Sequence, residues 1–101
     1  VCTVACPGGT FTGTLSSSNT SDEFQDAVAR TGLFSATLTG PGGTDFDLYL
    51  EYKSGSRWRT RSSSLGSTST ESISYTEGSS VLHRWKVSRW SGDGAYTLCV
   101  K

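Results

Sequence analysis

Asp45 and Asp47 are the residues of this sequence whose types and spacing could most readily do chemistry. On a β-strand the two carboxylates would lie on one face, roughly 6–7 Å apart along the chain. This spacing fits a carboxylate pair for glycoside hydrolysis. Because a glycine-rich stretch precedes them, our main interpretation is structural: both would accept hydrogen bonds from the amides of that turn.

Calcium is the second interpretation of the same acids, because Ca²⁺ takes about six to eight oxygen ligands. A calcium site would bring Asp22 beside Asp45 and Asp47, with Glu23 and Asp26 as further acids. We expect that no cofactor is required and keep Ca²⁺ as the alternative to the structural role.

The residue types argue against catalysis. His83 is the only histidine, so a serine nucleophile would have one candidate base and a zinc triad would lack its second histidine. The sequence also contains no Gly-x-Ser-x-Gly motif, which holds the nucleophile of many hydrolases. We therefore predict that the chain has no catalytic residues and that His83 is an ordinary strand histidine.

Basic residues concentrate between positions 53 and 89, which hold seven of the nine. In strands, alternation would align them with an exposed aromatic ring, a surface suited to anionic or extended polymers. The predicted substrate-binding residues are Arg57, Arg59, Arg61, Arg84, Lys86 and Trp90. The alternative is a solvated sheet face, and we expect Trp58 and Trp85 to fill the core instead.

Strands would position these residues, because apolar and polar side chains alternate over most of the chain. Turns rich in Gly and Ser separate the segments at a spacing typical of β-sandwiches. The expected strands are residues 10–15, 33–38, 45–52, 57–61, 72–76, 81–90 and 95–100, with a Ser/Gly/Thr loop at 62–69. One segment, residues 21–32, has the local pattern of a helix, with Ser21 as its cap and Gly32 at its end.

Length and charge limit the class of protein. The 101 residues with 34% hydrophobic content and 12 glycines favour one small all-β domain. The net charge is zero, and no run approaches the roughly 20 apolar residues of a membrane span, so we expect neither nucleic acid nor membrane as a partner. We expect a monomer. The chain begins at Val1 without any methionine, which indicates a mature product or an excised piece of a longer protein.

Three cysteines, Cys2, Cys6 and Cys99, lie at the two ends of the chain. The last strand of a sandwich commonly lies near the first residues, so we expect Cys99 to be bridged to Cys2 or Cys6. A zinc site is a poor match to this spacing with a single histidine. A disulfide indicates an oxidising, extracellular setting and therefore a secreted protein.

The run Asp45-Phe46-Asp47-Leu48-Tyr49-Leu50, preceded by Thr39-Gly40-Pro41-Gly42-Gly43, resembles the bacterial pre-peptidase C-terminal (PPC) domain family. Gly94-Ala95-Tyr96-Thr97-Leu98 resembles the family's C-terminal hairpin, and the resemblance covers about residues 12–101. We therefore divide the chain into a cysteine-containing N-terminal linker, residues 1–9, and a PPC-like domain, residues 10–101. The resemblance also implies a strand from Phe24 to Val28 in place of the local helix.

This resemblance implies an antiparallel, jelly-roll-like β-sandwich of about seven or eight strands. It further implies a non-catalytic accessory domain, attached to the catalytic domain of a secreted bacterial peptidase, that binds insoluble protein or aids secretion and stability. The alternatives are a carbohydrate-binding module, in which Trp58 and Trp90 would stack on sugar rings of a polysaccharide, and a pro-domain removed on maturation. The basic segment 57–61 and Trp85 depart from the family pattern and leave the choice of ligand open.

Overall fold

The computed structural model describes residues 6–26 and 28–101, and these form eight β-strands without a helix. The strands are β1 (Gly9–Leu15), β2 (Ser21–Gln25), β3 (Arg30–Thr39), β4 (Asp45–Ser54), β5 (Arg57–Ser64), β6 (Thr70–Val81), β7 (His83–Ser91) and β8 (Gly94–Val100). In the part of the chain that is described, no helix is long and apolar enough to cross a membrane.

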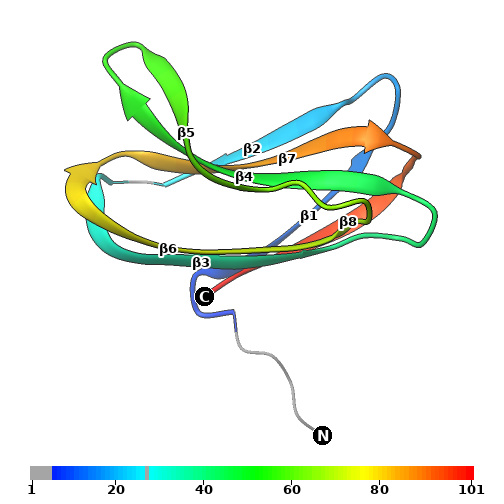
Figure 1. Cartoon of the computed structure of the whole chain (residues 1–101), viewed down its shortest axis with the longest axis horizontal. Coiled ribbons are helices and arrows are strands. Elements are labelled where there is room, and N and C mark those ends of the chain that lie inside the picture. The colour runs from blue at the N-terminus through cyan, green and yellow to red at the C-terminus, as the bar shows by residue number, and fades with distance from the viewer. Residues whose placement is uncertain (1–5, 27) are drawn as a thin grey trace, which may run out of the picture.

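The strands form two antiparallel four-stranded sheets that pack face to face (Figure 1). One sheet has the order β1-β8-β3-β6 and the other the order β2-β7-β4-β5. The chain crosses between the sheets at almost every connection, and only the β4–β5 hairpin stays within one. This arrangement confirms the antiparallel β-sandwich expected from the sequence.

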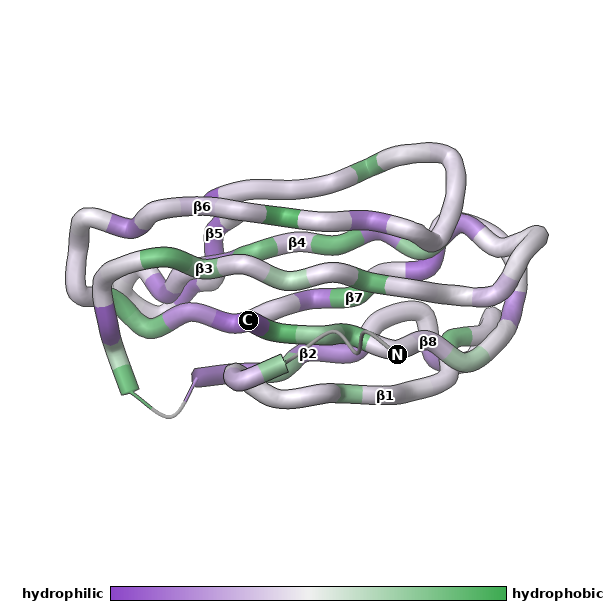
Figure 2. The backbone as a smooth tube through the Cα atoms, turned by 90° about the horizontal axis from the view of Figure 1, so that it is seen from below, coloured by the Kyte–Doolittle hydropathy of each residue, from purple (hydrophilic) through white to green (hydrophobic). Residues whose placement is uncertain are grey.

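Alternation along the strands builds the core between the two sheets. In β4, Phe46, Leu48 and Leu50 are fully buried, while the residues between them are less covered. Trp85 of β7 is 3% exposed and joins them, as expected for a core filler. Hydrophobic positions recur along β3, β4, β7 and β8 in Figure 2, so these four central strands carry most of the core.

Residues 21–25, where the local pattern indicates a helix and the family resemblance a strand, form β2, which lies earlier than the expected strand. β2 ends at Gln25, where its ladder with β7 stops, and Phe24 is paired with Trp85. Val28 lies outside any strand and is 65% exposed. The expectation that the strand runs from Phe24 to Val28 is therefore wrong, because pairing with β7 and not the spacing of the apolar residues sets its end.

The serine-rich stretch 62–69 is also more structured than expected. Its first three residues continue β5, and Ser69 at its end is 3% exposed. The Ser69 hydroxyl accepts a hydrogen bond from the backbone N–H of Phe46 (2.9 Å) and lies 2.6 Å from the Thr44 hydroxyl. Burying a polar group requires such partners, so Ser69 ties the β5–β6 connection to the start of β4.

The two ends of the domain are joined by a disulfide between Cys6 and Cys99, whose Cα atoms are 5.3 Å apart. This is one of the two pairings expected for Cys99; Cys2 lies outside the described residues. The bridge holds the segment before β1 to β8, and the Gly8 amide donates to the Val100 carbonyl beside it (3.0 Å). Since β1 is an edge strand paired only with β8, the disulfide fastens the edge of the sheet.

Candidate functional site

The candidate site is the side of the β2-β7-β4-β5 sheet that faces away from the core, which we call the outer face. On β4 the residues that alternate with the buried core are Asp45, Asp47 and Tyr49, followed by Glu51 after the same spacing. The face runs from Asp45 to Lys53, roughly 26 Å at the usual rise per residue. One end of it is acidic and the other end contains bases.

Two predicted binding residues of β7 lie on this face and contact aromatic rings. The Arg84 guanidinium lies 4.5 Å from the centre of the Trp58 ring and donates from Nε to Glu51 Oε1 (2.7 Å). The Lys86 ammonium lies 5.9 Å from the centre of the Tyr49 ring. Trp58 is half-buried beneath Arg84 and is not a core residue, so the expectation that it fills the core is wrong.

The three arginines of β5 point to the other side of the sheet. Because Trp58 is on the outer face, strand alternation turns Arg57 and Arg59 away from it, and both are exposed. Arg61 stacks on Tyr52, 3.7 Å from the ring centre. The six predicted binding residues therefore do not share one surface: Arg84, Lys86 and Trp90 are separated from the β5 arginines by the sheet itself.

Arg61 belongs to a buried polar cluster between the sheets. Its Nε donates to Glu77 Oε1 at 2.6 Å, and His83 Nε2 lies 2.9 Å from the same oxygen. Glu77 and His83 are 4% and 1% exposed. The hydrogen bond from Arg61, reinforced by those from His83 and the Ser79 amide, lowers the pKa of Glu77 to about 2. His83 is thus part of the internal packing, as expected for a strand histidine.

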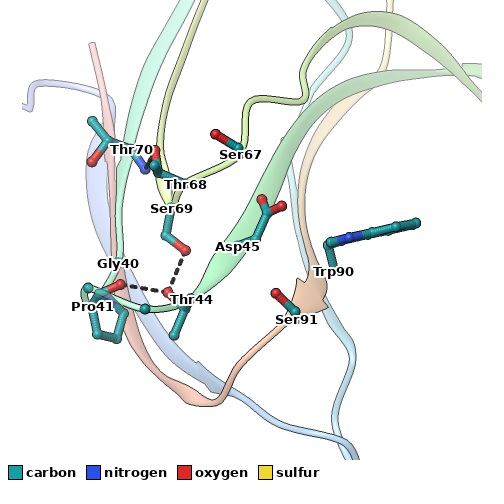
Figure 3. A pocket seen from close by; sticks show the side chains of 12 residues that line it. Gly40, Pro41, Thr44, Asp45, Ser67, Thr68, Ser69, Thr70, Trp90 and Ser91 are labelled. Carbon is teal, nitrogen blue, oxygen red and sulfur yellow. Dashed lines mark hydrogen bonds between the residues drawn. The ribbon is translucent and has the colours of Figure 1, made fainter.

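Trp90 is the most exposed large apolar side chain that the structure describes, at 75%. It lies at a bulge, where the β4–β7 register passes from Phe46–Arg89 to Asp45–Ser91 and leaves Trp90 without a partner residue on β4. A bulge re-aims a side chain, and here it turns the indole out beside Asp45 (Figure 3).

A groove lies between Trp90 and the β5–β6 connection. It has a volume of about 410 Å³ and is lined by Asp45, Asp47, Tyr49, Leu65, Gly66, Ser67 and Trp90. We call it the Trp90 groove. A second hollow of about 660 Å³, shown in Figure 3, continues past Asp45 toward the 40–44 turn. The two hollows share Asp45, Ser67 and Trp90, so they form one continuous depression.

Asp45 and Asp47 form the acidic floor of the Trp90 groove. Burial raises the pKa of Asp47 to about 6, and the charges of Asp45 and Glu71 act in the same direction. One oxygen of each aspartate is shielded from solvent and meets no donor among residues 6–26 and 28–101. The expectation that they accept hydrogen bonds from turn amides is therefore wrong; the amide of Phe46, which lies between them, donates to the Ser69 hydroxyl.

Asp22, the third residue of the expected calcium site, lies on the other side of the sheet. Its Oδ2 accepts a hydrogen bond from the Tyr96 hydroxyl across the sandwich (2.7 Å), and its Oδ1 accepts one from Asn19 (3.1 Å). The side chain is thus turned inward, whereas Asp45 and Asp47 face outward. Within the described part of the chain, no three acidic, histidine or cysteine side chains are grouped to hold a metal ion.

Sequence reasoning missed Leu65, Tyr49 and the buried glutamates. Leu65 is the one large apolar residue in a polar connection, which is a signal that could have been used. Glu51 and Glu77 partner arginines that lie 33 and 16 residues away in sequence. Only the register of the strands reveals those pairs.

Comparison with known proteins supports the fold. No protein-family model matches the chain. The crystal structure of the mitogen derived from Yersinia pseudotuberculosis is similar with a TM-score of 0.74 at 20% identity, covering 92% of this chain and 83% of that one. The pre-peptidase C-terminal domain of collagenase from Bacillus anthracis is similar with a TM-score of 0.71 at 19% identity, covering 92% and 88% of the two chains.

The resemblance to PPC domains thus extends from sequence motifs to the fold of the chain. At this level of identity the likeness establishes architecture, because one sandwich fold serves many functions. What the domain does has to be argued from its own surface.

Proposed function

We propose that this chain is a non-catalytic accessory domain of a secreted bacterial peptidase, which holds extended or insoluble protein substrate on its outer face. The single observation that carries the proposal is Trp90, a 75% exposed indole beside a groove at one end of a row of charged and aromatic residues. Exposed aromatic anchors of this kind dominate binding energy at many interfaces.

The charges along the outer face support an extended polypeptide as the ligand. Asp45 and Asp47 mark one end, and Lys86 and Arg84 lie toward the other. A chain carrying side chains of both signs would find complementary charge at each end. The likeness to the collagenase domain and the Cys6–Cys99 disulfide support attachment to a secreted peptidase.

Of the six residues predicted to bind, the structure favours Trp90 and Lys86. Arg84 and Arg61 are engaged in ion pairs with Glu51 and Glu77, so their charge is largely compensated. Arg57 and Arg59 are exposed on the opposite side of the sheet. We propose that those two arginines make at most a separate, salt-sensitive contact.

A pull-down on insoluble collagen, keratin, chitin and cellulose tests the proposal. Trp90→Ala should weaken retention on a protein polymer by roughly 1–3 kcal/mol, as expected for an aromatic anchor. Leu33→Ala is the matched control, because Leu33 is 58% exposed on β3 of the other sheet. Melting temperatures must be unchanged in both variants, so that lost binding does not report lost folding.

Two results would contradict the proposal. Equal retention of the parent and Trp90→Ala on every protein polymer would leave the outer face as a solvated surface and favour the pro-domain. Retention on chitin or cellulose alone would favour a carbohydrate-binding module. Trp58 could not serve such a module as an open platform, because Arg84 covers its ring.

A further inference from the structure

We propose that the Trp90 groove recognises a cationic side chain, a lysine ammonium or an arginine guanidinium, presented by an extended polypeptide. This inference deepens the proposed function, since Trp90 serves in both. It names the chemical group in the substrate that the acidic end of the outer face selects.

The walls of the groove are exposed apolar side chains. The structure describes four large apolar residues with high exposure, and two of them, Trp90 at 75% and Leu65 at 57%, line this groove. They come from β7 and from the β5–β6 connection, so the fold brings together residues 25 positions apart in sequence. Exposed apolar groups gathered around a hollow mark a binding site more often than scattered ones do.

The floor of the groove carries uncompensated negative charge. Asp45 and Asp47 form no ion pair with any described residue, in contrast to Glu51 and Glu77. The base nearest along the face is Lys86, whose ammonium lies by the Tyr49 ring. An incoming cation would offset the charge of both carboxylates, and hydrogen bonds between ionised groups are stronger than those between neutral ones.

An organic cation fits this groove better than a metal ion or a sugar. A metal would need further oxygen ligands, and the part of the chain that is described groups no third acid with these two for that purpose. A neutral sugar would stack on Trp90 but leave the repulsion between the two carboxylates in place. An ammonium or guanidinium group can interact with both the Trp90 ring and the two carboxylates, because an aromatic face attracts a cation as carboxylates do.

Protons should compete with the cation. The titratable and charged groups around Asp47 are Asp45 and Tyr49 on β4, Glu71 on β6 and Lys86 on β7. Since burial and the charges of Asp45 and Glu71 raise the pKa of Asp47 to about 6, a proton replaces the cation as pH falls below that value. The dissociation constant should rise roughly tenfold between pH 7.5 and pH 5.

Calorimetric titration of the intact chain with a capped, glycine-spaced peptide carrying three lysines tests the inference. The same peptide with each lysine N-acetylated is the neutral probe. The lysine peptide should bind and the acetylated one should not. The double variant Asp45→Asn/Asp47→Asn should weaken binding at least tenfold and abolish its pH dependence, whereas Asp93→Asn, an acid 63% exposed on the β7–β8 turn, should bind as the parent does.

Equal binding of the two peptides, or parental affinity in the double variant, would overturn the inference. If the double variant does not fold, Leu65→Ala provides the test, because this exposed side chain has little structural role; unchanged affinity in that variant would equally overturn it. The double variant is then applied to the insoluble proteins. If the parent is retained on insoluble protein but does not bind the lysine peptide, the cation site alone is overturned. If the parent neither is retained on insoluble protein nor binds the peptide, the proposed function is overturned too.

Discussion

Removing the Cys6–Cys99 bridge should destabilise the domain by about 4–5 kcal/mol. The bridge closes a loop spanning 93 positions, and the chain-entropy relation gives about 4.7 kcal/mol at that length. The variant should be Cys6→Ala/Cys99→Ala in a Cys2→Ala background, so that no remaining thiol can re-pair. For a domain of this size, such a loss should lower the melting temperature by roughly 20 °C or more.

Urea denaturation followed by tryptophan fluorescence measures this effect, with Cys2→Ala alone as the control. If the bridge acts by confining the unfolded chain, its loss should also raise the dependence of unfolding free energy on urea, because the freed chain exposes more surface. A loss of stability with unchanged urea dependence would refute that reasoning and place the effect in the native contacts of β1. A change below about 1 kcal/mol would show that the β1–β8 ladder suffices to hold the edge strand.

Four other substitutions test the interior and the groove. Glu77→Gln should lower the free energy of unfolding by about 3 kcal/mol near pH 7, because Arg61 and His83 lose a shared carboxylate. Since the pKa of Glu77 is lowered to about 2, the difference from the parent should shrink as pH falls from about 4.5 toward 2. A difference that does not change with pH would show that the charge of Glu77 is not its cause. Tyr96→Phe should lower the free energy of unfolding by about 1–2 kcal/mol, because the hydrogen bond to Asp22 is lost. Gly13→Ala should lower it further, since a Cβ there would lie 2.5 Å from the Tyr96 hydroxyl and 2.6 Å from the Asp22 carboxylate. Equal melting temperatures of the alanine variant and the parent would contradict this. The pKa of Asp47 in the folded chain is raised to about 6, so between about pH 6 and 4 the folded chain binds a proton that the unfolded chain does not, and the free energy of unfolding should rise as pH falls through that window. Asp47→Asn should be more stable than the parent at pH 7.5 and should lose this pH dependence. A variant less stable than the parent at pH 7.5 would contradict the prediction.

The positions of most strands could be predicted because alternation is a local property. In β4 the sequence alternates between core residues such as Phe46 and outward acids such as Asp45, and the structure follows that pattern. β2 could not be placed in this way, because Phe24 and Val28 are spaced to share a face in either a helix or a strand. The ladder with β7 decides the matter, and it is a contact between distant parts of the chain.

The two groups of predicted binding residues, on β5 and β7, could not be placed relative to each other for a related reason. Alternation correctly put the three β5 arginines on one side, but it carries no information about which side of the sheet that is. A register shift in the β4–β5 ladder near Leu50 and Glu51 leaves Arg61 without a partner residue on β4, and Arg61 reaches Glu77 of the opposite sheet. The buried acid that neutralises Arg61 becomes visible only when the two sheets are assembled.

The distribution of charge separates residues that serve the fold from residues that serve a ligand. Glu51 and Glu77 each have an arginine partner, so their burial is compensated. Asp45 and Asp47 lie together with a shielded oxygen on each and no donor in the described chain, an arrangement that costs stability through repulsion and desolvation. Asparagine at either position would keep the strand and remove that cost. Because packing does not require two carboxylates there, and Trp90 stands exposed beside them, we attribute their charge to the cationic ligand proposed for the groove and not to folding.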